Sequence, residues 1–304
     1  MAVIEVEDLR KEYRRLRGGR TVALDGLDLA VPEGGVFGFL GPNGAGKTTT
    51  IRCLLGLIRP SGGRARLLGA DSRRQLASVL RRVGSIVETP TMYPRFSGRR
   101  NLELLARLHR IPHAAIDEIL DRVGLSDRAG HLVKTYSLGM KQRLGIAGAL
   151  LKDPEVLILD EPANGLDPAG IVEVRQLLRR LAAEGRTVFV SSHILSEVQQ
   201  VADRVAILAR GRCVASGPVD EVLSAGRASA LVVRLDDLPA GLEALRAAGL
   251  PASLDGDAIR VSPPPGDGAT ITQVLAERGL FLSELRPERI DLETVFLELT
   301  KEPE

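Results

Sequence analysis

One segment of the chain has the residue types and spacing of a loop that binds phosphate groups. The segment Gly41–Thr48 reads GPNGAGKT, which fits GxxxxGK[ST], and it lies between an apolar stretch and a segment with helical spacing. Glycines let the backbone turn N–H groups inward, and the start of the following helix adds positive partial charge. Lys47 brings a charge for the β- and γ-phosphates, and the Thr48 hydroxyl is placed for Mg²⁺. The residues predicted to bind the phosphates are Gly41, Pro42, Asn43, Gly44, Ala45, Gly46, Lys47, Thr48 and Thr49.

Two adjacent carboxylates follow a second apolar stretch. The run Val156–Leu159 is continuously apolar and is followed by Asp160 and Glu161. Buried parallel strands place their carboxyl ends at the ligand edge of a sheet. We therefore expect Asp160 to hold the water shell of Mg²⁺ and Glu161 to polarise an attacking water. A solvated strand end is the alternative for this pair, and a phosphate loop in the same chain weighs against it.

The elements that position these residues alternate between strands and helices. Val36–Leu40 predicts a buried strand, and Thr48–Leu57 predicts the helix after the loop. This alternation indicates an α/β fold with a mostly parallel sheet under helical cover. Residues Val3–Val31 predict short antiparallel strands with breaks at Gly18-Gly19 and Asp25-Gly26. Other predicted helices are Gln75–Arg82, Asn101–Leu108, Ala114–Val123 and Gln142–Leu151, and other predicted strands are Glu155–Leu159 and Thr187–Ser191.

A change of character near Ser216 predicts a domain boundary. We expect a first domain over residues 1–218 and a small α+β domain over residues 219–304. The elements expected in the second domain follow the order β-α-β-β-α-β, which is typical of a ferredoxin-like module. They are Leu231–Leu235, Ala240–Ala248, a hairpin over Ala252–Val261, Ile271–Arg278, Leu280–Leu285 and a last helix, Leu292–Leu299.

Composition narrows the class of protein. The 304 residues include 41 Lys plus Arg and 39 Asp plus Glu, so the net charge of +2 gives no electrostatic case for nucleic acid. Aromatic residues make up 3% of the chain and tryptophan is absent, which leaves few platforms for base stacking. No apolar run approaches the 18 or so residues of a membrane-spanning helix, and the N-terminal residues lack the pattern of a signal peptide. We therefore expect a cytoplasmic protein.

The segment Tyr136–Arg143 decides between classes of phosphate-loop proteins. It reads YSLGMKQR, which resembles the signature LSGGQ followed by QR of ATP-binding cassette (ABC) proteins, with Leu138 in place of glycine and Met140 in place of glutamine. Residues 1 to about 218 resemble the nucleotide-binding subunit of an ABC transporter. The resemblance implies a P-loop NTPase fold, the ABC cassette, with a mixed sheet, an antiparallel β subdomain and a helical subdomain over residues 88–150. The signature residues, expected to contact ATP bound by the opposite subunit, are Ser137, Leu138, Gly139 and Met140.

Further elements of the family occur in its order along the chain. Asp167 matches the D-loop, and His193 matches the switch histidine that holds the γ-phosphate and Glu161 in register. Tyr13 lies where the family places an aromatic ring against adenine. Glu88, in Ile86–Pro90, occupies the position of the Q-loop glutamine and keeps an oxygen for Mg²⁺. The resemblance thus implies catalytic roles for Glu161 and His193 and metal binding by Thr48, Asp160 and Glu88.

The resemblance also implies an activity and partners. It implies an ATPase that binds ATP and Mg²⁺, forms a homodimer around two Mg-ATP, and drives a separate polytopic membrane permease from the inner face of the cell membrane, with no nucleic acid bound. Glu88 together with YSLGMKQR is similar to the bacitracin-resistance and lantibiotic-immunity branch and, more broadly, to daunorubicin-type exporters, which implies export of a drug, antibiotic or peptide.

Two other classes share the phosphate loop. ABC-type ATPases that act on nucleic acid or chromosomes insert long coiled coils between the loop and the signature, and too few residues separate Lys47 from Ser137 for one. A simple P-loop kinase or binding module would leave Ser137, Glu161 and His193 together without an explanation.

Overall fold

The computed structural model describes residues 2–14, 18–88, 90–225, 230–263, 268–288 and 292–300 of the chain. Two compact units are formed, Met1–Val219 and Asp220–Glu304. In the described ranges, no helix has both the length and the apolar character needed to cross a bilayer.

The larger unit is built on a six-stranded sheet. β10 pairs antiparallel with β9, and the other neighbours pair in parallel. The buried apolar strands at its centre are typical of a parallel sheet covered on both faces, and their carboxyl ends meet at one edge. In spatial order the strands are β10 (Arg212–Pro218), β9 (Arg204–Ala209), β3 (Gly35–Leu40), β8 (Thr187–Ser192), β7 (Val156–Asp160) and β6 (Val83–Ile86).

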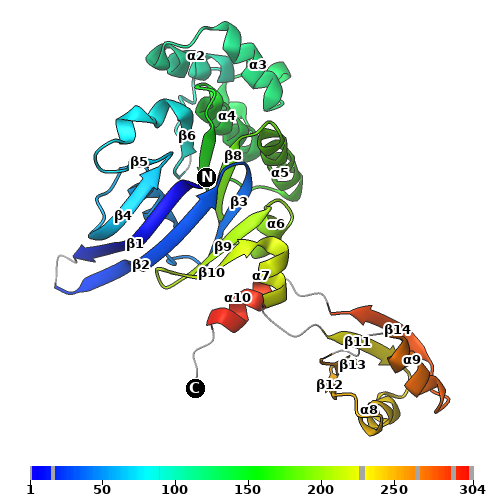
Figure 1. Cartoon of the computed structure of the whole chain (residues 1–304). Coiled ribbons are helices and arrows are strands. Elements are labelled where there is room, and N and C mark those ends of the chain that lie inside the picture. The colour runs from blue at the N-terminus through cyan, green and yellow to red at the C-terminus, as the bar shows by residue number, and fades with distance from the viewer. Residues whose placement is uncertain are drawn as a thin grey trace. The chain divides into compact units, whose positions relative to one another are not determined.

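A second sheet is antiparallel and begins with a long hairpin (Figure 1). Its order is β2 (Arg20–Pro32), β1 (Ala2–Arg14), β4 (Gly62–Leu67) and β5 (Ala70–Asp71). The predicted break at Gly18-Gly19 is confirmed, because both residues lie between β1 and β2. The predicted break at Asp25-Gly26 is wrong. Leu9 and Arg10 pair with Leu27 and Asp25, so Gly26, at φ +74°, forms a one-residue bulge in a continuous strand.

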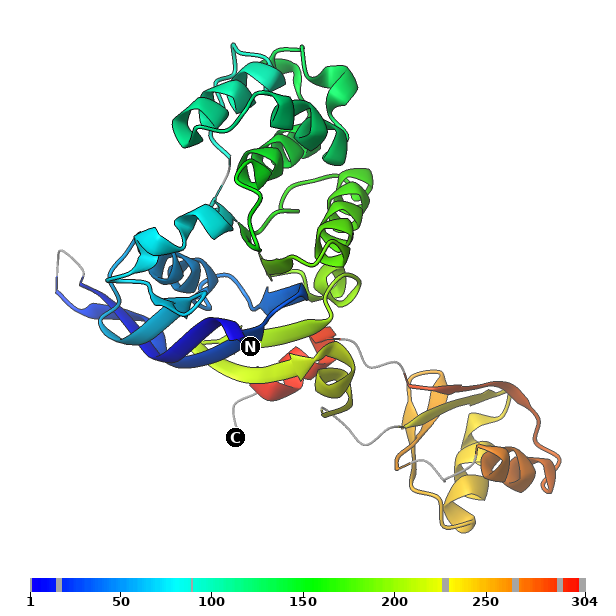
Figure 2. The same cartoon turned by 45° about the horizontal axis from the view of Figure 1, so that its top comes forward.

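Helices cover the parallel sheet, and a group of them extends from it. α2 and α3 lie beside each other in both Figure 1 and Figure 2. The predicted helix Gln75–Arg82 is wrong as an α-helix: it consists of two 3₁₀ turns, Leu76–Ser78 and Leu80–Arg82. The segment is short and is followed at once by β6, so a longer helix has no room to form. The helices of this unit are α1 (Lys47–Leu54), α2 (Gly98–His109), α3 (Ala114–Arg122), α4 (Leu138–Leu150), α5 (Pro168–Ala183) and α6 (Leu195–Gln199). α7 (Val219–Ala225) begins at the last residue of this unit, and its other residues belong to the smaller unit.

Phenylalanines form the centre of one core of the larger unit. The Phe37 and Phe189 rings stack with centroids 5.9 Å apart, and the Phe39 ring lies 5.2 Å from that of Phe189. All three are buried and belong to a cluster that joins the antiparallel sheet to the parallel one. This packing holds β3 against β8, the strands that lead into the phosphate loop and toward His193.

The smaller unit has its own four-stranded antiparallel sheet and core. Its strands lie in the order β12 (Ala252–Asp255), β13 (Ala258–Val261), β11 (Leu231–Leu235) and β14 (Leu282–Pro287). α8 (Leu238–Ala247) and α9 (Ala269–Ala276) contribute Leu245 and Leu275, both fully buried, to the same cluster as Val233 and Ile259. The last described helix is α10 (Leu292–Thr300).

Candidate nucleotide-binding site

The loop between β3 and α1 has no room for a side chain at Gly41 or Gly46. At Gly41 an added Cβ atom would lie 2.5 Å from the Leu208 carbonyl oxygen. Gly46 has φ +112°, and a Cβ atom there would lie 2.7 Å from the Ala23 carbonyl oxygen. At Gly44, with φ +84°, an added Cβ would meet nothing within 4 Å. The loop is therefore packed tightly against β2 on one side and open on the other, which is the form of a cradle for a ligand.

In the described part of the chain, the N-terminus of α1 has no side-chain cap, unlike those of α2, α4 and α5. Ser97, Ser137 and Asp167 cap α2, α4 and α5, each with a side-chain oxygen that accepts a backbone N–H. Among the described residues, no side chain caps α1, and its first turn contains no acidic residue. The N–H groups at the start of α1 are therefore available to an anion, and the positive end of the helix favours one.

A cavity of about 480 Å³ lies over the loop. It combines residues from the loop, the hairpin and the ends of the parallel strands. Sequence reasoning predicted nine of its lining residues: Tyr13, Asn43, Gly44, Gly46, Lys47, Thr48, Thr49, Glu161 and His193. It missed Thr21, Val22, Ala23 and Asn164. A signal existed for Asn164, which lies between Glu161 and Asp167, but none for the three residues of β2, because only the fold brings them here.

Lys47 is buried at the base of this cavity. Its ammonium group donates to the carbonyl oxygens of Gly41 at 2.7 Å and Pro42 at 3.3 Å. It also lies 3.2 Å from Oε1 of Glu161. The exposed fraction of Lys47 is 6%, so its charge is held in a fixed position rather than in solvent. Besides the Glu161 carboxylate, an ammonium group held there can bind a phosphate group, which carries more negative charge than a carboxylate.

Glu161 and His193 form a hydrogen-bonded pair across two strands. Oε2 of Glu161 lies 2.8 Å from Nδ1 of His193 and accepts the His193 backbone N–H at 3.3 Å. The backbone N–H of Glu161 donates to the Ser191 Oγ at 3.0 Å, which fixes the start of the turn that carries the carboxylate. Glu161 has φ +51°, a left-handed conformation that is uncommon for a non-glycine residue and recurs at functional sites.

Asp160 is not among the described residues that line the cavity. Its carboxylate is buried, and the Ser191 hydroxyl donates a hydrogen bond to it. Ser191 was not predicted, although the register explains it: Asp160 and Ser191 are partners in the parallel pair β7 and β8. The Thr48 hydroxyl in the cavity lining and the buried Asp160 carboxylate are hard oxygen donors of the kind that Mg²⁺ prefers.

Several predicted site residues lie elsewhere. Glu88 is 65% exposed and forms an ion pair with Arg52, and it is not among the described residues that line the cavity. Its neighbour Thr89 lies outside the described residues. Asp167 accepts the Gly170 N–H at 3.1 Å as the cap of α5. The described lining residues also do not include the signature residues Ser137, Leu138, Gly139 and Met140, which begin α4.

Tyr13 is near the mouth of the cavity. Its side chain is 38% exposed, and the Lys11 ammonium lies 5.0 Å from the centre of its ring. A partly exposed ring next to a phosphate cradle offers a flat apolar surface for a base.

Comparison with known proteins identifies the family of this chain. Residues 24–164 match the family model described as ABC transporter. The bacitracin transport ATP-binding protein of Bacillus licheniformis is 48% identical over 227 residues, which cover 74% of this chain and 72% of that protein. The chain belongs to the ABC transporter family.

A second ABC relative is similar over nearly the whole chain. The daunorubicin resistance ATP-binding protein of Streptomyces coeruleorubidus is 38% identical over 308 residues, covering 98% of this chain and 95% of that protein. Among solved structures, cbiO1 from Clostridium perfringens, part of the ABC transporter complex cbiONQ, superposes with a TM-score of 0.64 at 30% identity. The superposition covers 73% of this chain and 90% of cbiO1. The ABC cassette fold, the role as an ATP-binding subunit and the ATPase activity expected from the sequence are thus confirmed.

Proposed function

We propose that this ABC protein is the ATPase subunit of an exporter for a drug, antibiotic or peptide. The observation that carries the proposal is the similarity to a daunorubicin resistance ATP-binding protein, because it extends over 98% of the chain and includes the smaller unit. Similarity to a bacitracin transport protein supports the same class of cargo. Relatives named for transport favour this function over an ABC ATPase of nucleic acid or chromosomes.

The cavity supports specific roles for its residues. The phosphate loop, the uncapped start of α1 and Lys47 bind the β- and γ-phosphates of ATP. Glu161 takes the proton of the attacking water, and His193 holds the Glu161 carboxylate through the 2.8 Å contact. Thr48 and Asp160, directly or through water, are the residues that would hold Mg²⁺, which supplies charge neutralisation at the phosphates when bound. Glu88 joins them only if its ion pair with Arg52 opens.

A second copy of the chain completes the site in this proposal. The start of α4 carries the signature, and it does not line the described cavity of its own chain. In a homodimer the signature residues and Asp167 would face the ATP bound by the partner. ATP would then bind the closed dimer more tightly than the open state and so favour closure.

The chain is proposed to have two domains, residues 1–218 and 219–304. The division into units at Val219 supports this boundary. The order β-α-β-β-α-β and the strand order β12-β13-β11-β14 support a ferredoxin-like module in the smaller one. We assign this module an accessory role and the ATPase to the larger domain.

A separate polytopic permease is the proposed partner, at the inner face of the cell membrane. Tyr93 and Phe96 are 62% and 39% exposed, and their rings lie 5.4 Å apart at the start of the helical subdomain. Two adjacent exposed aromatic rings are typical of a protein interface. They are the residues we expect to contact the permease.

Co-purification tests the proposed function. The tagged chain, purified from detergent-solubilised membranes, is expected to retain a polytopic membrane protein. The Y93A/F96A variant should lose it, whereas a control that removes two exposed apolar side chains of the smaller unit, L254A/F281A, should retain it. Purification of the wild-type chain alone, or with DNA, would overturn the proposal.

Tyr13→Ala is expected to weaken ATP binding by roughly tenfold, because stacking on a base contributes about 1–3 kcal/mol. Removing the ring should affect nucleosides and leave pyrophosphate binding unchanged. Competition of ATP and of pyrophosphate for a fluorescent nucleotide measures the two separately. Equal loss for both ligands would show that Tyr13 supports the loop rather than the adenine.

A further inference from the structure

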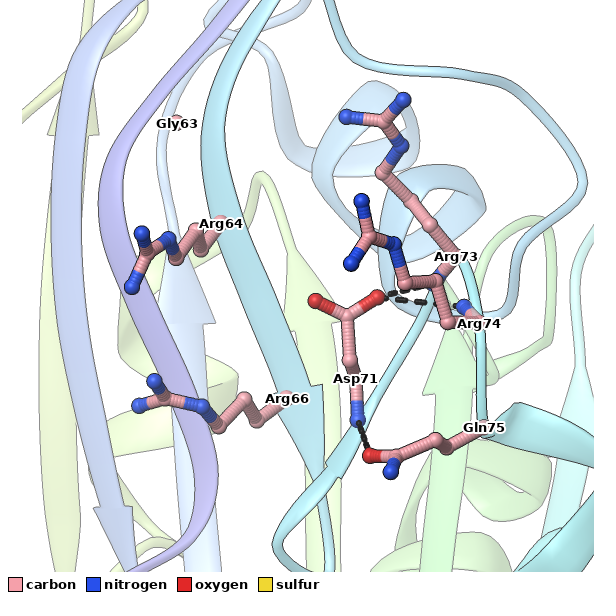
Figure 3. Close-up of a pocket in the computed structure, with 7 residues that line it drawn as sticks. All are labelled: Gly63, Arg64, Arg66, Asp71, Arg73, Arg74 and Gln75. Carbon is pink, nitrogen blue, oxygen red and sulfur yellow. Dashed lines mark hydrogen bonds between the residues drawn. The ribbon is translucent and has the colours of Figure 1, made fainter.

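A second cavity of about 470 Å³ lies on the antiparallel sheet, and arginines dominate its lining. It is formed by β4, β5 and the turn that follows them (Figure 3). None of its lining residues also lines the nucleotide cavity in the described part of the chain. The lining residues are Gly63, Arg64, Arg66, Asp71, Arg73, Arg74 and Gln75.

Local structure determines where these side chains project. Arg64 and Arg66 are two residues apart on β4 and therefore share a face, while Ala65 between them is buried on the other. Figure 3 shows their side chains running parallel to each other. Asp71 accepts the backbone N–H groups of Arg73 at 2.8 Å and Arg74 at 3.1 Å. These two bonds form a turn that presents both arginines on the surface.

The arginines of this cavity are not equally neutralised. Arg66 is paired with Glu7 at 2.8 Å and with Glu5 at 3.3 Å. Within the described residues, Arg64, Arg73 and Arg74 form no ion pair and are exposed.

Asp71 is the one carboxylate among the lining residues that the structure describes, and its single negative charge offsets only part of this excess. Its Oδ1 atom is occupied by the two backbone N–H groups of the turn, so its role is to shape the loop. Three guanidinium groups that form no ion pair among the described residues thus share one hollow with a single carboxylate.

We propose that this cavity binds an anion that carries phosphate groups. A guanidinium group offers paired N–H donors whose spacing matches phosphate oxygens, and it stays charged at every physiological pH. The volume lies in the range of small-ligand sites, large enough for more than one phosphate group. The same chemistry is offered by a free phosphorylated anion and by a phospholipid headgroup.

Another basic cavity, lined by residues that include Arg81, Arg110 and Lys152, makes a weaker case. The Lys152 ammonium already donates to the carbonyl oxygens of Leu80 and Val83, each at 2.7 Å. Part of its cationic lining is therefore used within the protein.

Pyrophosphate titration of the full chain tests the proposal. Mg-ADP at saturation occupies the nucleotide site, and calorimetry then reports any second site. We expect saturable pyrophosphate binding that falls roughly tenfold or more in R73Q/R74Q. The control R128Q/R278Q removes the same amount of charge from two exposed arginines elsewhere and should bind as the wild type does.

Two further measurements separate the explanations. Lys47→Ala should keep the second pyrophosphate site, and loss of that site with Lys47 would assign the binding to the phosphate loop and overturn the proposal. Flotation with phosphatidylcholine vesicles, with and without phosphatidylglycerol, tests whether the ligand is a lipid. If the wild type binds the anionic vesicles and R73Q/R74Q does not, the ligand is a phospholipid headgroup. If the wild type binds pyrophosphate but not the vesicles, the ligand is a soluble anion.

ATP hydrolysis and thermal unfolding of R73Q/R74Q should match the wild type, because these arginines are outside the nucleotide cavity. The proposal is overturned if R73Q/R74Q and the wild type bind both probes equally, or if the wild type binds neither. Neither of these results would affect the proposed ATPase and transport function.

Discussion

Glu161→Gln is expected to slow ATP hydrolysis by roughly 10²- to 10⁴-fold, on the order of 3 to 5 kcal/mol in activation free energy. The amide keeps the shape of the side chain but cannot take a proton from water. It can still contact His193, which lies 2.8 Å from Glu161 Oε2. ATP binding should therefore persist while turnover slows, and the ATP-bound dimer should accumulate.

Phosphate release and sedimentation with Mg-ATP measure these two effects. Glu243→Gln, the same change at an exposed position of the smaller unit, is the matched control and should hydrolyse ATP normally. Wild-type turnover in Glu161→Gln would remove Glu161 from the role of base. A Glu161→Gln variant that is slow but never dimerises with ATP would instead contradict the proposed closed dimer.

Lys47→Ala should weaken binding of ATP by roughly 10- to 100-fold. A charged hydrogen bond contributes about 1.5–3 kcal/mol, and each 1.4 kcal/mol or so is tenfold in affinity. The substitution removes the ammonium that bonds the Gly41 carbonyl at 2.7 Å and lies 3.2 Å from Glu161. Both the ligand and the loop therefore lose a partner.

Titration with a fluorescent ATP analogue measures the affinity, and thermal unfolding shows whether the loop still folds. Lys134→Ala, which removes an exposed lysine, provides the control. Normal ATP affinity in Lys47→Ala would contradict the role of the phosphate loop. A large loss of thermal stability would show that Lys47 acts mainly on the loop itself.

The phosphate loop and the acidic strand end could be predicted because their signals are local. The apolar runs before Gly41 and Asp160 form buried strands, and residues that follow them line one cavity. The pairing of one strand with another cannot be predicted from such local signals. The hydrogen bond from Ser191 to Asp160 depends on the register of β7 against β8, which no single segment encodes.

Other differences reflect how the local signals were weighed. Gly26 looks like a turn residue, but pairing with β1 on both sides of it turns the glycine into a bulge. Helix α5 was not predicted, although Asp167 as cap and Pro168 in the first turn are a recognised helix start. Glu88 was assigned to the metal by resemblance to the family, and its role there stays a prediction; the sequence did not indicate its ion pair with Arg52.

Half of the phenylalanines in the chain belong to one cluster on the two strands that lead to the nucleotide cavity. The chain has six, and the rings of Phe37 and Phe39 on β3 both pack against that of Phe189 on β8, the strands that precede Gly41 and His193. The register of β3 against β8 sets the distance between the phosphate loop and His193. Core packing and nucleotide affinity are therefore linked quantities, so an ATP-binding assay would detect a rearranged hydrophobic core in this protein.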